Sequence, residues 1–297
     1  MQRIYYGAPE TGKSFEVDKI LKEVNDENIF RVTFYPEYSY SDFVGQIKPK
    51  KTDSGFEYDI VEGVFLKALK KAYEDTSVDV YLIIEEVSRG RTTAIFGDIF
   101  QLLDRVKTGL FKGFSRYSIN NDLISSRIPQ IPSDKVKLPP RFHILGTLNT
   151  SDQSVYPIDT AFKRRFDWIY VDTKPKMDID GNPINNFDIS LKDIDGNSKV
   201  VKWCTFYQKI NEFIVSKEYL ELGEDKQLGQ FFVETDSMSQ VDFANKVLFY
   251  LWSDIASISY KNNVSLFSKK INSFSQLVDY YLSDKTVFSN EFLELLL

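Results

Sequence analysis

The sequence predicts an α/β protein in which a doubly wound parallel sheet is followed by a small α-helical domain. Over the first part of the chain, short apolar runs that suit buried strands alternate with segments of helical spacing. Two of these runs, residues 78–84 and 142–148, are almost continuously apolar, which is typical of parallel strands buried on both faces. Beyond residue 200 the spacing is helical.

The expected elements follow in a regular order. We expect strands at residues 3–6, 29–34, 78–84, 142–148 and 168–171. We expect helices at residues 15–24, 60–75, 91–106, 159–165, 202–217, 239–260 and 272–283, with a terminal apolar stretch at 292–297. Residues 107–140 are rich in loop signals. Three parts are therefore predicted: an α/β core at 1–173, a polar hairpin or linker at 174–200, and a helical domain at 201–297.

Composition and charge exclude several classes of protein. The 297-residue chain is 42% hydrophobic and 27% charged, which is ordinary for a soluble globular protein. Its net charge of −6 argues against a nucleic-acid footprint over the whole surface, although a local basic stripe stays open. Neither a membrane-spanning run nor a signal peptide is found, so we expect a cytoplasmic protein with no membrane partner. The one cysteine, Cys204, is expected to be a buried small hydrophobe.

The loop after the first strand carries a phosphate-binding pattern. Residues 7–14 read G-A-P-E-T-G-K-S, which satisfies the Walker A pattern between a strand and a helix. The glycines let backbone N–H groups turn toward phosphate oxygens, beside the positive end of the following helix. Lys13 would reach the β- and γ-phosphates, and the Ser14 hydroxyl would bind Mg²⁺. The expected nucleotide-binding residues are Gly7, Ala8, Pro9, Glu10, Thr11, Gly12, Lys13, Ser14 and Phe15. A P-loop nucleoside triphosphatase is thus predicted.

Two carboxylates end the strand at 78–84. The first acid after such a strand normally anchors Mg²⁺ through water, and the second polarises the attacking water. We therefore assign Glu85 to the metal and Glu86 to the general base. The alternative is a pair of solvated carboxylates.

Three further polar residues complete the expected site. Asn149 ends the strand at 142–148, where its amide can orient the attacking water. Arg164 and Arg165 follow a short helix, and an arginine there can reach a neighbouring subunit's nucleotide as an arginine finger. A solvated basic patch is the alternative for this pair. His143 lies within the same buried strand as Asn149, and we expect it to be a core residue whose ring nitrogens are hydrogen-bonded.

The segments D-I-D-G-N at 178–182 and 193–197 allow two interpretations. A calcium loop of the EF-hand type needs glycine at its sixth position, whereas here glycine is fourth. Asp-Gly is also a strong hairpin-turn signal. Two tight turns are the favoured interpretation.

In this order and spacing the motifs resemble those of the AAA+ superfamily. Several segments resemble its McrB-like group, the nucleotide-driven motor subunits of methylation-dependent restriction systems. The segments are 34–45, 55–58, 62–65, 83–90, 138–140, 146–154, 159–166, 225–232 and 251–254. The resemblance covers most of residues 3–255. It implies a P-loop AAA+ core with a parallel sheet, followed by a small α-helical lid domain.

The resemblance also implies cofactors and partners. It implies GTP or ATP with Mg²⁺, and it adds Asp152 to the nucleotide-binding residues and Arg89 to the candidates that act in trans. It implies a homo-oligomer, a hexameric ring in expectation, working with a nuclease subunit of the McrC type. DNA would be reached through the complex or through an N-terminal domain that group members commonly carry.

The sequence departs from the group at two site positions, and two other functions stay open. Glu85 stands where the group has Asp, and Glu10 stands at a loop position that is usually Gly. Because of Glu85, a nucleotide-binding module that has lost hydrolysis remains an alternative function. The Glu-x-x-Arg pattern of Glu86 and Arg89 is shared with remodelling ATPases of the MoxR type, which act on proteins.

Overall fold

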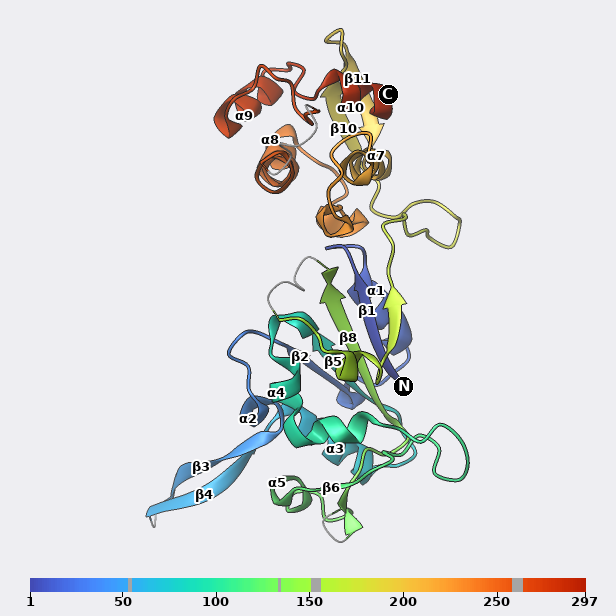
Figure 1. The fold of residues 1–297 in the computed structure, drawn as a ribbon, viewed down its shortest axis with the longest axis vertical. Helices are drawn as coiled ribbons and strands as arrows, with labels where there is room; N and C mark the ends of the chain where they lie inside the picture. Colours follow the sequence, from blue (N-terminus) through green and yellow to red (C-terminus); the bar gives the residue numbers. More distant parts are fainter. Residues whose placement is uncertain (53–54, 133–134, 151–155, 258–263) are drawn as a thin grey trace. The chain divides into compact units, whose positions relative to one another are not determined.

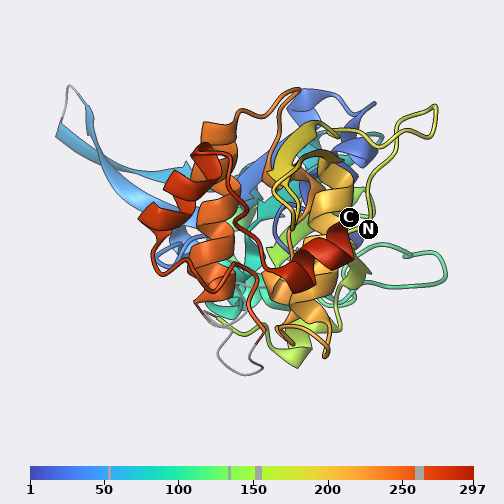
Figure 2. The same ribbon diagram turned by 90° about the horizontal axis from the view of Figure 1, so that it is seen from above.

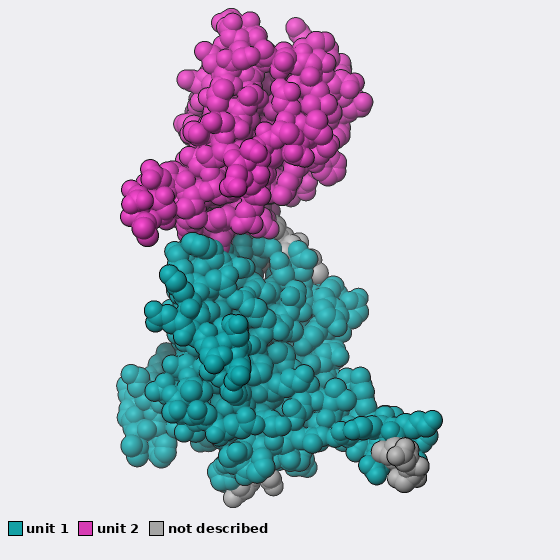
Figure 3. Space-filling view, turned by 180° about the vertical axis from the view of Figure 1, so that it is seen from behind, with its two compact units in different colours: residues 1–6, 13–170 teal, residues 7–12, 171–297 magenta. Residues whose placement is uncertain are grey.

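The computed structural model describes residues 1–52, 55–132, 135–150, 156–257 and 264–297. The chain divides into two compact units, coloured teal and magenta in Figure 3. Unit 1 comprises residues 1–6 and 13–170, and unit 2 comprises residues 7–12 and 171–297. Most of the phosphate loop therefore groups with the C-terminal residues, whereas the helix that follows the loop belongs to unit 1.

A five-stranded sheet forms the centre of unit 1 (Figure 1). Its strands are β1 (Gln2–Gly7), β2 (Ile29–Thr33), β5 (Val80–Glu85), β8 (Phe142–Asn149) and β9 (Asp167–Tyr170). They stand in the order β2-β5-β8-β1-β9, and the pairs β1–β9, β2–β5 and β5–β8 are parallel. Each strand begins and ends within two residues of its predicted range. The predicted α/β fold is confirmed.

Helices of unit 1 cover the sheet. α1 (Lys13–Leu21) packs beside β8, and α3 (Val64–Glu74) packs on β2 and β5. α4 (Thr92–Phe96) ends at Gly97, whose φ of +49° stops the α-helix, and the chain continues as a 3₁₀ helix over Gly97–Leu103. The single helix predicted at 91–106 is therefore divided. The shorter elements are α2 (Tyr40–Phe43), α5 (Asp122–Ser125), α6 (Thr160–Lys163), β6 (Ile119–Asn120) and β7 (Lys135–Val136).

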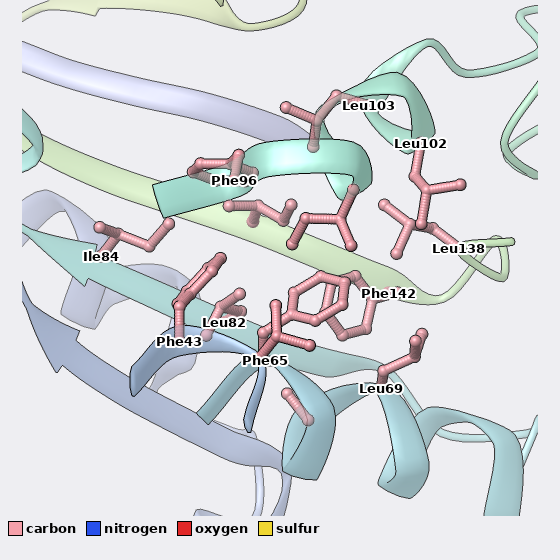
Figure 4. Packing of buried hydrophobic residues seen from close by; sticks show 14 of the residues in the cluster. Phe43, Phe65, Leu69, Leu82, Ile84, Phe96, Leu102, Leu103, Leu138 and Phe142 are labelled. Atoms are coloured by element: carbon pink, nitrogen blue, oxygen red, sulfur yellow. The ribbon is translucent and has the colours of Figure 1, made fainter. Parts of the chain in front are cut away.

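Aromatic rings fill the core of unit 1 between the sheet and its helices. Figure 4 shows Phe43, Phe65, Phe96 and Phe142 gathered around the β5 side chain Leu82. The rings of Phe65 and Phe142 meet edge to face with their centroids 5.8 Å apart. This packing holds β5 and β8 together, and so it positions the polar residues at the carboxyl ends of both strands.

A hairpin that the sequence analysis did not predict projects from unit 1, as Figure 1 and Figure 2 both show. It consists of β3 (Gly45–Thr52) and β4 (Gly55–Glu62), so the first residues of the helix predicted at 60–75 belong to a strand. One face of the hairpin is apolar and the other carries opposite charges, as the cross-strand pairs Ile47–Ile60, Pro49–Tyr58, Lys48–Asp59 and Lys50–Glu57 show.

Unit 2 is mainly helical. Its helices are α7 (Trp203–Val215), α8 (Gln240–Phe243), α9 (Phe274–Leu282) and α10 (Asn290–Leu296), and α8 leads into π-helical turns at Ala244–Leu248 and Leu251–Ala256. α7 lies at the centre and buries Trp203, Phe206 and Phe213 completely. Cys204 is also buried there, as expected. Within the described ranges, no helix combines the length and apolar character needed to cross a membrane.

The two D-I-D-G-N segments form tight turns. The second joins β10 (Asp188–Lys192) to β11 (Ser198–Lys202), and the first is closed by an isolated bridge between Met177 and Pro183. Gly181 and Gly196 both adopt a φ of +82°, which suits glycine in such turns. In the part of the chain that the structure describes, no group of three or more His, Cys, Asp or Glu side chains could hold a metal. The turn interpretation is confirmed.

Candidate nucleotide-binding site

The phosphate loop joins β1 to α1 through backbone conformations that need little side-chain bulk. Gly12 has a φ of +88°, and Glu10 has a left-handed φ of +56° although it carries a side chain. The Thr11 hydroxyl donates to the Ala8 carbonyl over 3.1 Å, which closes the loop on itself. Turns that contain left-handed residues, here Glu10 and Gly12 on either side of Thr11, can direct successive N–H groups into an anion-binding concavity. The loop therefore fits a phosphate group.

A segment of unit 2 lies directly on this loop. The Phe231 N–H donates to the Glu10 carbonyl over 3.0 Å. Gly229 approaches so closely that a Cβ on it would collide with the backbone of Glu10 and Thr11. The loop conformation is thus tied to residues 229–231.

The first turn of α1 presents the remaining Walker A residues in unit 1. Lys13 is buried, whereas Ser14 is exposed and Phe15 is 38% exposed. Lys19, one turn later, places its ammonium 4.7 Å from the Phe15 ring centroid. Ser14 is therefore accessible for the Mg²⁺ role that its position predicts.

Glu85, at the end of β5, is held by two neighbours. Its carboxylate accepts a hydrogen bond from the Thr147 hydroxyl of β8. It also accepts one from the Arg31 guanidinium of β2 over 3.2 Å, and Arg31 pairs in turn with Asp18. A hard cation at Glu85 would meet an oxygen ligand of the type it prefers. Such a cation would also have to share this carboxylate with Arg31.

Glu86, which follows β5, and Asn149, which ends β8, lie in contact. The Asn149 Nδ2 is 3.2 Å from each carboxylate oxygen of Glu86. Glu86 is also 3.3 Å from the Arg89 Nε of the same chain, and its φ is +56°. This left-handed turn directs the carboxylate toward the end of the neighbouring strand β8. The arrangement can accept a proton from a water bound beside both side chains.

The two adjacent arginines after α6 have different surroundings. Asp159 caps α6 by accepting from the Phe162 N–H over 2.6 Å, and this hydrogen bond lowers the pKa of Asp159. Arg165 turns inward: it pairs with Asp104 over 2.7 Å and stacks over the Phe100 ring at 4.1 Å. Arg164 is exposed. Only Arg164 therefore has a guanidinium accessible to another molecule.

Sequence analysis missed several residues that contact the site. Arg31 and Thr147 bind Glu85, and Gly229 and Phe231 contact the phosphate loop. Arg31 could have been noticed in the sequence, because it is a charged residue within the mostly apolar strand predicted at 29–34. The remaining predicted residue, Asp152, lies outside the described residues.

Known proteins resemble this chain over much of its length. The sequence matches the AAA domain family of the dynein-related subfamily over residues 4–166. It is 33% identical to "Type II restriction enzyme BsuMI component YdiS" of Bacillus subtilis (strain 168), over 97% of this chain and 87% of that protein.

A second relative is more distant. The chain is 26% identical to "Type IV methyl-directed restriction enzyme EcoKMcrB subunit" of Escherichia coli (strain K12), over 76% of this chain and 46% of that protein. The chain thus spans about half the length of this second relative. A solved structure from Cytophaga hutchinsonii matches at 16% identity over 60% of this chain and 42% of that one. Its TM-score is 0.32.

Proposed function

Because the chain belongs to the AAA domain family, and within it to the McrB-like NTPases, we propose that it hydrolyses GTP or ATP with Mg²⁺. The observation that carries the proposal is the contact between Glu86 and Asn149. Glu86 directly follows β5 and Asn149 ends β8, and β8 stands next to β1, the strand that leads into the phosphate loop. Ligands of open α/β sheets bind at the carboxyl ends of the strands.

Each residue has a role that its surroundings support. Lys13 would neutralise the phosphates, while Ser14 and Glu85 would hold Mg²⁺ and neutralise the charge on the phosphate oxygens. Glu86 would take the proton of the attacking water, and Asn149 would hold that water in line. The left-handed backbone at Glu86 supports this role, because residues in such conformations cluster at functional sites.

The proposal extends to assembly. Arg164 would act on the nucleotide of a second copy in a ring, for which six copies are our expectation. Family membership supports the ring. The two restriction-enzyme relatives support a place in a DNA restriction complex, with a nuclease subunit of the McrC type and DNA reached through the complex.

Phosphate release from GTP and from ATP tests hydrolysis directly. We expect Mg²⁺-dependent release by the unmodified chain and none by Lys13→Ala, because loss of the ammonium removes the main charge that holds the phosphates. Lys22→Ala removes an exposed lysine just after α1 and serves as the control. Equal phosphate release by Lys13→Ala and by the control would contradict the proposal. If the unmodified chain releases no phosphate from GTP and none from ATP, only nucleotide binding would remain of the proposed function.

A further inference from the structure

A cavity of about 710 Å³ lies at the amino ends of the central strands, within unit 1. Gln2, which begins β1, Pro140, which precedes β8, and Asp167, which begins β9, contribute to its lining. Glu86 and Asn149 lie at the carboxyl ends instead. Because β8 advances by about 3.3 Å per residue, its two ends are roughly 23 Å apart. The cavity is therefore a separate place from the proposed hydrolytic residues of the same chain.

A pinned loop forms one wall of this cavity. Arg105 is half-buried and donates to the carbonyls of Gly113 over 2.6 Å and Pro139 over 2.7 Å. Burial lowers the pKa of Arg105 to about 10, so it stays charged at neutral pH. Gly113 has a φ of +88°, and a Cβ there would lie 2.9 Å from the Pro140 Cβ. Residues 106–114, the loop at the right of Figure 1, are thus held in a defined conformation.

Basic side chains from residues 106–114 and from the end of α6 contribute to the lining of the cavity. Its lining includes the exposed side chains of Lys107, Lys112, Arg116 and Arg164, with Asp167 as a nearby carboxylate. Over the described ranges, no hydrogen bond or ion pair involves the charged ends of these four basic side chains. The other acid in the lining, Asp104, is already paired with Arg165. This concentration of unneutralised cations is unusual for a chain with a net charge of −6.

We propose that this cavity binds a compact polyphosphate, namely the phosphate chain of a nucleoside triphosphate. Its volume lies in the range of small-ligand pockets, roughly 300–1,000 Å³. Lysine and arginine are the side chains that recognise phosphate oxygens. Tyr117, which is 50% exposed, adds an aromatic surface to the same lining. A double helix would instead need a basic stripe along an extended surface.

The polyphosphate has two sources, free nucleotide or the nucleotide held by a second copy of this chain. Only the second source rests on the proposed function, because it extends the role of Arg164 to Lys107, Lys112 and Arg116. The tests below distinguish the sources, and they leave Arg164 unchanged.

The first test titrates inorganic tripolyphosphate into monomeric Lys13→Ala protein by calorimetry. If free ligand fills the cavity, tripolyphosphate binds, and adding Lys112→Ala with Arg116→Ala weakens binding at least about tenfold. The matched control, Lys22→Ala with Lys67→Ala, removes the same charge from exposed positions outside the lining and should change affinity less than twofold. This result does not depend on hydrolysis, so it stands even if no phosphate release is found.

The second test follows assembly by sedimentation at increasing GTP or ATP. If the nucleotide belongs to a second copy, Lys112→Ala with Arg116→Ala raises the nucleotide concentration needed for assembly about tenfold, while binding to the monomer is unchanged. Wild-type behaviour of this double variant in both tests would overturn the proposal. A competition experiment gives a second outcome that would overturn the proposal. If duplex DNA displaces bound tripolyphosphate and free nucleotide does not, the cavity is part of a DNA-binding surface.

Discussion

Replacing Arg164 by Ala is expected to lower the rate of phosphate release about 10³-fold, which is the lower end of the effect of removing an arginine finger. Nucleotide binding at the phosphate loop of the same chain should be unchanged, because Arg164 lies near the amino end of β9, whereas Glu86 and Asn149 lie at the opposite edge of the sheet. Release is measured with saturating GTP or ATP, and binding is measured by calorimetry without Mg²⁺.

The neighbouring Arg165→Ala variant is the matched control. The Arg165 side chain is 8% exposed and its guanidinium is paired with Asp104, so we expect the variant to lower the free energy of unfolding by about 1.5–3 kcal/mol. Mixing copies tests action in trans. Arg164→Ala copies keep the phosphate loop and Lys13→Ala copies keep the finger, so mixed assemblies should regain part of the activity. An inactive mixture would contradict a role for Arg164 on a second copy.

Replacing Gly229 by Val is expected to weaken nucleotide binding at least about 100-fold. The new side chain would collide with the backbone of Glu10 and Thr11, and the hydrogen bond from Phe231 N–H to the Glu10 carbonyl would be lost. Because the proposed phosphate contacts come from backbone N–H groups, a shift of the loop would remove several of them together. Calorimetry with GTP and ATP measures the effect, and circular dichroism checks that the protein remains folded.

Gly181→Val separates this clash from ordinary backbone strain. Gly181 also lies in unit 2 and has a φ of +82°, but nothing lies within 4 Å of a Cβ built there. We expect this control to lose about 1–2 kcal/mol of stability and to bind nucleotide normally. Normal nucleotide binding by Gly229→Val would show that residues 229–231 do not control the loop.

Much of the fold could be predicted because each strand of the central sheet is a short apolar run. In β5, for example, the residues from Val80 to Ile84 are all buried, so the sequence pattern is continuous. The positions of the phosphate loop, Glu86 and Asn149 at or just after the ends of strands could be predicted in the same way. Polar residues directly after neighbouring parallel strands meet at one edge of the sheet.

The rest depended on packing that a linear pattern does not contain. The β3–β4 hairpin has Lys, Pro and Glu in its strands, and these lower any strand signal. Arg164 and Arg165 are equivalent as sequence, and only the position of Asp104 shows which guanidinium is buried. Arg89 was predicted as a candidate to act on another copy, and the sequence did not indicate its ion pair with Glu86 of the same chain over 3.3 Å.

The left-handed backbone at Glu86 lowers the stability of the fold at a residue that is proposed to act in hydrolysis. A residue with a Cβ in this region costs about 1–2 kcal/mol relative to glycine, and Glu10 in the phosphate loop has the same φ of +56°. A selection for heat resistance alone would therefore favour glycine at both positions. At position 10 the change would leave Gly12, Lys13 and Ser14 of the phosphate loop in place. At position 86 it would remove the proposed base, so thermal stability and turnover are opposed at this single residue.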